Sequence, residues 1–162
     1  MMHVSVTQTV LRSPIHILSF GFGSGLFPVA PGTMGTLIAI PIFLLLTTFS
    51  SIIYLLFVTI LFFVGCWASG QTAEALNVHD HPGIVIDEIV GYLITMIFVP
   101  FTWHWVILGF LLFRLFDIWK PWPISIVDKQ VKGGLGIMLD DVLAAIYSLL
   151  SLHIVIWSVK LL

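Results

Sequence analysis

The placement of charged residues constrains this chain more than any other feature of its sequence. No charged side chain occurs between Arg12 and Glu74, and two further uncharged stretches cover residues 89–113 and 142–159. An unpaired charge in hydrocarbon costs several kcal/mol, so uncharged stretches of this length are typical of membrane-embedded segments. Only 9% of the 162 residues are charged, whereas a soluble domain carries about 25%. We therefore expect a membrane protein.

Length, charge and cysteine content limit the alternatives further. The length allows one domain, and neither a repeat nor a linker divides the chain, so residues 1–162 are expected to form a single integral-membrane domain. The net charge of −2 gives no reason to expect nucleic acid as a partner. Cys66 is the only cysteine, which excludes an internal disulfide.

The uncharged stretches predict about five short membrane helices. Three candidate spans cover residues 35–48, 52–69 and 142–160. The stretch 84–119 is too long for one crossing, because ~20 residues suffice for a spanning helix. It also contains Pro100 near its middle.

The positions of the carboxylates favour a helical hairpin in this long stretch. A single crossing would separate Asp87 and Glu88 from Asp117 by the thickness of the membrane. A reversal near Pro100 and Trp103 instead gives two arms, residues 84–99 and 103–119, and places the carboxylates on one face. The positive-inside rule makes that face cytoplasmic, because four cations lie in the same region: Arg114, Lys120, Lys129 and Lys132. The expected fold is an all-α, compact, multi-pass helical bundle.

A glycine-rich segment, GFGSGLFPVAPGTMG at residues 21–35, is the first polar island. Its glycines and prolines predict an irregular loop that leads into a helix after Gly35. Backbone amides of such a loop can bind an oxyanion, with Ser24, Gly32 and Thr33 as the candidate substrate-binding residues. The Lys-Ser/Thr of a P-loop is absent. A helix contact through small residues explains the same composition equally well.

Two acidic islands follow, HDHPGIVIDEIVG at residues 79–91 and GGLGIMLDDVLAA at residues 133–145. Adjacent carboxylates in an apolar run are costly unless a cation or metal neutralises them. We expect the Asp87–Glu88 and Asp140–Asp141 pairs to be neutralised in this way. The histidines and Asp80 of the first island fit a solvated turn, and Glu74 a solvated helix end.

The remaining island, FRLFDIWKPWPI at residues 113–124, combines both signs of charge. Arg114, Asp117 and Lys120 are spaced by three residues, which predicts Arg–Asp and Asp–Lys neighbours along one helix edge. A basic cluster beside anionic lipid has the same composition. A phosphate clamp, with Arg114 and Lys120 as the binding cations, fits better because Asp117 interrupts an otherwise apolar helix.

The carboxylates form an oxygen-only ligand set, which selects magnesium or manganese over zinc. We expect the same five residues to be the metal ligands and the catalytic residues: Asp87, Glu88, Asp117, Asp140 and Asp141. A hard cation, two protein cations and a glycine-rich loop together indicate phosphate chemistry at a lipid surface.

The four islands, in this order, resemble the bacterial phosphatidylglycerophosphatase A family over residues 21–145. The resemblance implies an Mg²⁺-dependent, multi-pass enzyme of the bacterial inner membrane. It would convert phosphatidylglycerophosphate to phosphatidylglycerol in phospholipid synthesis.

Other membrane functions would leave different signatures in the sequence. A CDP-alcohol phosphatidyltransferase would carry a spaced DG…AR…G…D…D signature, which is missing. Lipid phosphatases with Lys…Arg-Pro and Ser-Gly-His signatures are also unsupported. A small transporter or cation-conducting protein could use buried carboxylates, but it would need them at mid-membrane depth. Here they lie near the ends of apolar runs.

Overall fold

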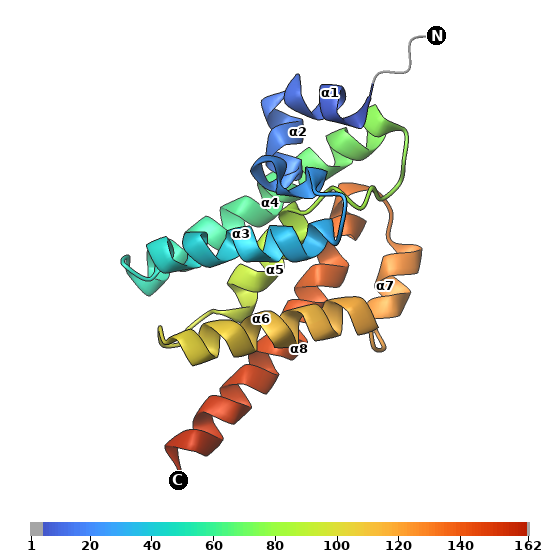
Figure 1. Ribbon diagram of the computed structural model, residues 1–162. Helices are drawn as coiled ribbons and strands as arrows, with labels where there is room; N and C mark the ends of the chain where they lie inside the picture. Colours follow the sequence, from blue (N-terminus) through green and yellow to red (C-terminus); the bar gives the residue numbers. More distant parts are fainter. Residues whose placement is uncertain (1–4, 162) are drawn as a thin grey trace.

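A computed structural model describes residues 5–161 and shows an all-helical bundle (Figure 1). No β-strand occurs within this described range. The helices are α1 (Val6–Leu11), α2 (Pro14–Ser19), the 3₁₀ segment η1 (Gly21–Leu26), α3 (Pro31–Leu46), α4 (Ser51–Leu76), α5 (Ile86–Thr95), α6 (Trp103–Trp119), α7 (Ile124–Gln130) and α8 (Gly133–Lys160).

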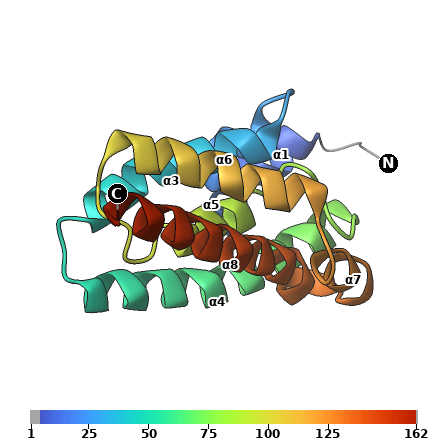
Figure 2. The same ribbon diagram turned by 90° about the horizontal axis from the view of Figure 1, so that it is seen from below.

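The short helix α5 forms the centre of the bundle. It packs against α3, α4, α6 and α8, and Figure 2 shows α8 running between α4 and α6. Seven of its ten residues are buried, because neighbouring helices surround it. The arrangement fixes both ends of α5 against its neighbours, and its first turn carries the Asp87–Glu88 pair.

Two helices of the described chain, α4 and α8, are long and apolar enough to cross a membrane. At 1.5 Å per residue they reach about 39 and 42 Å. Their outward faces are apolar, with Phe63 and Trp157 each 65% exposed. Contiguous apolar surface of this kind is unusual on a soluble monomer.

The predicted hairpin is confirmed. The α5 and α6 helices run antiparallel, because Glu88 lies near Arg114 and the Tyr92 hydroxyl donates to the carbonyl oxygen of Val106, 3.1 Å away. The chain reverses between Thr95 and Trp103. The start of α5 and the end of α6 therefore meet at one end of the bundle.

Several helix boundaries differ from the predicted ones. The first arm of the hairpin is shorter than the predicted residues 84–99, since α5 covers only Ile86–Thr95. The glycine-rich segment is not one irregular loop, since η1 forms its first part and α3 begins at Pro31. Proline suits the first turn of a helix, where its missing N–H has no partner to lose. Helices α4 and α8 extend beyond residues 52–69 and 142–160, and α1, α2 and α7 were not predicted.

Candidate active site

A cavity of about 250 Å³ opens at the end of the bundle where α3, α5, α6 and α8 meet. All five carboxylates predicted from the sequence line it: Asp87, Glu88, Asp117, Asp140 and Asp141. Side chains separated by more than fifty positions in the sequence thus share one space. We call this space the acidic cavity.

Three of these carboxylates converge most closely. Asp87, Glu88 and Asp141 each offer an oxygen, and the three oxygens lie within 4.8 Å of one another. Asp87 Oδ1, Glu88 Oε2 and Asp141 Oδ2 are buried and have no hydrogen-bond partner. Buried polar atoms are nearly always hydrogen-bonded, and buried like charges destabilise one another. The cluster therefore fits an oxygen-binding cation.

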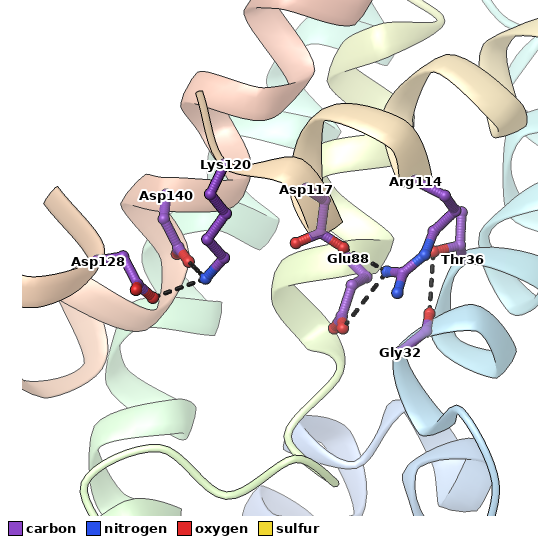
Figure 3. A network of polar contacts seen from close by, with 8 residues as sticks. All are labelled: Gly32, Thr36, Glu88, Arg114, Asp117, Lys120, Asp128 and Asp140. Atoms are coloured by element: carbon purple, nitrogen blue, oxygen red, sulfur yellow. Dashed lines mark hydrogen bonds and ion pairs between the residues drawn. The ribbon is translucent and has the colours of Figure 1, made fainter. Parts of the chain in front are cut away.

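Arg114 neutralises the next part of the cavity. Its Nη1 lies 2.5 Å from Oδ2 of Asp117, one turn further along α6, and 3.7 Å from Oε1 of Glu88 (Figure 3). The Asp117 contact is the predicted i, i+3 pair. Arg114 is only 15% exposed in its side chain, and its Nε is buried without a hydrogen-bond partner. The guanidinium thus retains donor capacity inside the protein.

Gly32 brings α3 against this pair. A Cβ atom at Gly32 would overlap with Oε1 of Glu88 and would lie 3.2 Å from Nη1 of Arg114. The Thr36 hydroxyl donates to the carbonyl oxygen of Gly32, 2.9 Å away, within the same turns of α3 (Figure 3). Only glycine leaves room for the carboxylate at this position.

Lys120 departs from its predicted pairing. The sequence spacing placed it beside Asp117, but its Nζ lies 2.6 Å from Oδ1 of Asp128 and 2.6 Å from Oδ2 of Asp140 (Figure 3). The reason is local, because α6 ends at Trp119 and Lys120 adopts a left-handed backbone with φ of 45°. Burial lowers the pKa of the Lys120 ammonium, but its two hydrogen-bonded carboxylates outweigh burial and hold that pKa above its ordinary value.

The charge balance of the acidic cavity is strongly negative. Six carboxylates and two cations line it, an excess of four negative charges when all are ionised. A phosphate monoester is itself an anion and would be repelled by this surface. The donor set is entirely oxygen in the cluster of three, which suits Mg²⁺ or Mn²⁺. The residues present therefore fit a divalent cation.

Only some of the predicted substrate-binding residues line the acidic cavity. Arg114, Lys120 and Gly32 line the acidic cavity. The Ser24 hydroxyl instead donates to the carbonyl oxygen of Gly21, 2.9 Å away within η1. Thr33 lies in the first turn of α3 but is not among the residues lining the cavity.

Two residues near the site were missed by sequence reasoning. Asp80 lines the cavity, although its turn was interpreted as a solvated surface. Asp128 on α7 holds Lys120. The only signal for Asp128 was that it lies among the clustered charges, because its pairing with Lys120 crosses a turn and follows no helical spacing.

Comparison with known proteins gives a consistent family. The sequence profile of the family described as phosphatidylglycerophosphatase A matches residues 17–156. A protein of Escherichia coli (strain K12) with that name is 45% identical over 146 residues, 90% of this chain and 85% of the relative. A Haemophilus influenzae protein of the same name is 44% identical over 142 residues, 86% of this chain and 87% of the relative.

A third relative carries a different name. The "Putative phosphatidylinositol-3-phosphatase" of Bacteroides thetaiotaomicron is 40% identical over 151 residues, 88% of this chain and 94% of the relative. No solved structure matches the chain significantly. The profile covers most of the chain, including all five carboxylates that line the acidic cavity. By this measure and by its identity to the relatives, the chain belongs to the phosphatidylglycerophosphatase A family.

Proposed function

We propose that this protein hydrolyses the phosphomonoester of phosphatidylglycerophosphate, giving phosphatidylglycerol and phosphate in bacterial phospholipid synthesis. The observation that carries the proposal is the acidic cavity, which all five carboxylates line in a chain 45% identical to a phosphatase of that name. Two apolar helices and membership of this family indicate association with a membrane. We place the protein in the inner membrane, as a multi-pass bundle whose acidic cavity faces the cytoplasm.

The proposed cofactor is Mg²⁺, held by the cluster of Asp87, Glu88 and Asp141, with Asp117 and Asp140 beside it. Their unpartnered oxygens and the negative excess of the cavity support this assignment. When bound, the ion supplies Lewis-acid polarisation of the phosphoryl group and lowers the pKa of water. Hydrolysis then adds the oxygen of water to phosphorus, breaks the bond to the glycerol oxygen and returns a proton to that oxygen.

Arg114 and Lys120 have different roles in this proposal. Arg114 binds the equatorial phosphate oxygens, where negative charge spreads in the transition state, and Asp117 orients the guanidinium through its ion pair. Lys120 keeps the buried Asp140 carboxylate neutralised through its 2.6 Å contact. Burial of these groups strengthens their electrostatic effects relative to water.

A transporter or channel is less well supported by the same structure. A conduit needs polar side chains along its whole length. The carboxylates instead line one cavity at one end of the bundle. A pocket at the other end of the bundle, near Tyr54, Phe98 and Phe101, is lined mostly by apolar side chains.

Phosphate release by the purified protein tests the proposal. Wild-type protein should release phosphate from phosphatidylglycerophosphate, lose activity with a chelator and regain it with Mg²⁺. Asp87→Asn, Asp117→Asn and Asp141→Asn should each nearly abolish release, while Glu74→Gln at an exposed position of α4 should not. Phosphatidylinositol 3-phosphate serves as the comparison substrate, because one relative bears that name. Activity that survives all three Asn variants would remove this site.

A further inference from the structure

One face of α6 carries an apolar groove on the outside of the bundle. The groove is shallow and open to the surroundings, and it is lined by Leu111, Arg114, Leu115, Ile118 and Trp119. Their spacing, i, i+3, i+4, i+7 and i+8, places them along a single helix face. The four apolar members are all more than half exposed. We call this surface the α6 groove.

Arg114 joins the α6 groove to the acidic cavity. It is the residue that lines both spaces. Its guanidinium faces Glu88 and Asp117 inside the protein (Figure 3), while its neighbours Leu111 and Leu115 face outward. A molecule lying in the groove would therefore meet a buried cation at the point where the cavity begins.

We propose that the α6 groove binds the glycerol backbone and an acyl chain of the phospholipid substrate, so that the headgroup passes Arg114 into the acidic cavity. This inference rests on the proposed function. Charge complementarity favours a lipid phosphate as occupant, because an anionic phosphate beside an apolar chain matches a guanidinium beside an apolar groove. Substrate then approaches laterally from the bilayer, across α6.

The length of the α6 groove is close to the depth of one leaflet of the hydrocarbon core, in which one acyl chain lies. Leu111 and Trp119 are eight residues apart, which corresponds to about 12 Å along the helix. Half of the ~30 Å hydrocarbon core is roughly 15 Å. The exposed faces of α4 and α8 around Ile60 and Ile154 lie in uncharged stretches. The one cation within α8, Lys160, is its last residue, at the end of the helix away from Asp140 and Asp141.

A groove-filling variant tests the proposal. Leu115→Trp adds bulk at a position that is 52% exposed, and Leu56→Trp makes the same change on α4 at 57% exposure. The measured quantity is the ratio of kcat/KM for dioleoyl to that for dihexanoyl phosphatidylglycerophosphate. We expect this ratio to fall about tenfold in Leu115→Trp. Loss of one methylene-sized contact in an apolar site changes the relative kcat/KM of two substrates by about that factor. Leu56→Trp should keep the wild-type ratio, and equal ratios in both variants would overturn the proposal.

Photolabelling of the wild-type protein gives a readout that does not depend on turnover or on a variant's folding. Phosphatidylglycerophosphate with a diazirine on one acyl chain should label residues 103–119. Excess phosphatidic acid, which carries a phosphomonoester, should suppress the label, whereas phosphatidylcholine should not. Labelling spread over all outward helix faces, or unaffected by phosphatidic acid, contradicts the groove. Labelling of α6 without phosphate release by the wild type would retain the groove and refute the proposed function.

Discussion

A substitution at Gly32 tests whether activity depends on the position of Glu88 without unfolding the protein. In Gly32→Ala, the new methyl group would overlap with Oε1 of Glu88 and crowd Nη1 of Arg114. The backbone tolerates the change, because Gly32 is not among the residues with positive φ and alanine suits a helix better than glycine. The substitution should therefore move the carboxylate, not unfold α3.

The expected loss of activity follows from that displacement. Relief of the overlap requires a shift on the order of 1 Å, and a misplacement of that size costs about 100-fold in rate. This corresponds to about 2.7 kcal/mol in the activation barrier. The assay is Mg²⁺-dependent phosphate release, with thermal unfolding in detergent measured in parallel.

Gly70→Ala is the matched control for this experiment. Gly70 also lies in a helix, and its added Cβ would make ordinary contacts, the nearest at 3.4 Å to the backbone nitrogen of Gly134. It should keep wild-type turnover. The expected 100-fold loss leaves Gly32→Ala with about 1% of wild-type activity. If this variant retained more than about a third of wild-type activity, the placement of Glu88 in the site would be refuted.

Three further predictions follow from the packing and the topology. Lys120→Ala leaves the buried Asp140 without its cation and should lower kcat/KM by about 100-fold, whereas Asp128→Asn removes a more exposed partner and should cost less than about fivefold; similar losses in both variants would contradict the pairing. Gly91→Ala would place a Cβ 2.5 Å from the buried ring of Phe113 and should destabilise the protein by about 1–3 kcal/mol; an unchanged melting temperature would argue against this contact. In a Cys66-free background, cysteines at Thr102 and Ser125 should react with an impermeant reagent from opposite sides of the membrane; labelling of both from the same side would overturn the hairpin topology.

The hairpin could be predicted because charge placement carries information about depth in a membrane. Carboxylates are costly in hydrocarbon, so Asp87, Glu88 and Asp117 had to share one side, and Pro100 marked the reversal. The structure confirms this arrangement by bringing Glu88 beside Arg114. The helix ends were less predictable, since the packing of Gly134 against Cys66 allows α8 to begin well before its uncharged stretch.

The pairing inside the site could be predicted only where it follows helical spacing. The i, i+3 rule found Arg114–Asp117 but failed for Lys120, because the backbone leaves the helix at that residue. Lys120 instead pairs with Asp140 on α8 and with Asp128, which lies beyond a turn that contains Pro121 and Pro123. No sequence rule gives the direction of a side chain after such a turn. The sequence therefore predicted the members of the acidic cavity better than their partners.

Direct measurement of divalent-ion binding tests the central claim, that Asp87, Glu88 and Asp141 form one cation site. Mn²⁺ can stand in for Mg²⁺, because both prefer oxygen ligands, and its electron paramagnetic resonance signal reports the free ion during titration of the purified protein. We expect Asp87→Asn, Glu88→Gln and Asp141→Asn each to weaken Mn²⁺ binding by about tenfold or more, which is at least about 1.4 kcal/mol. The exposed control Glu74→Gln should bind as the wild type does. Wild-type affinity in all three cluster variants would contradict the account.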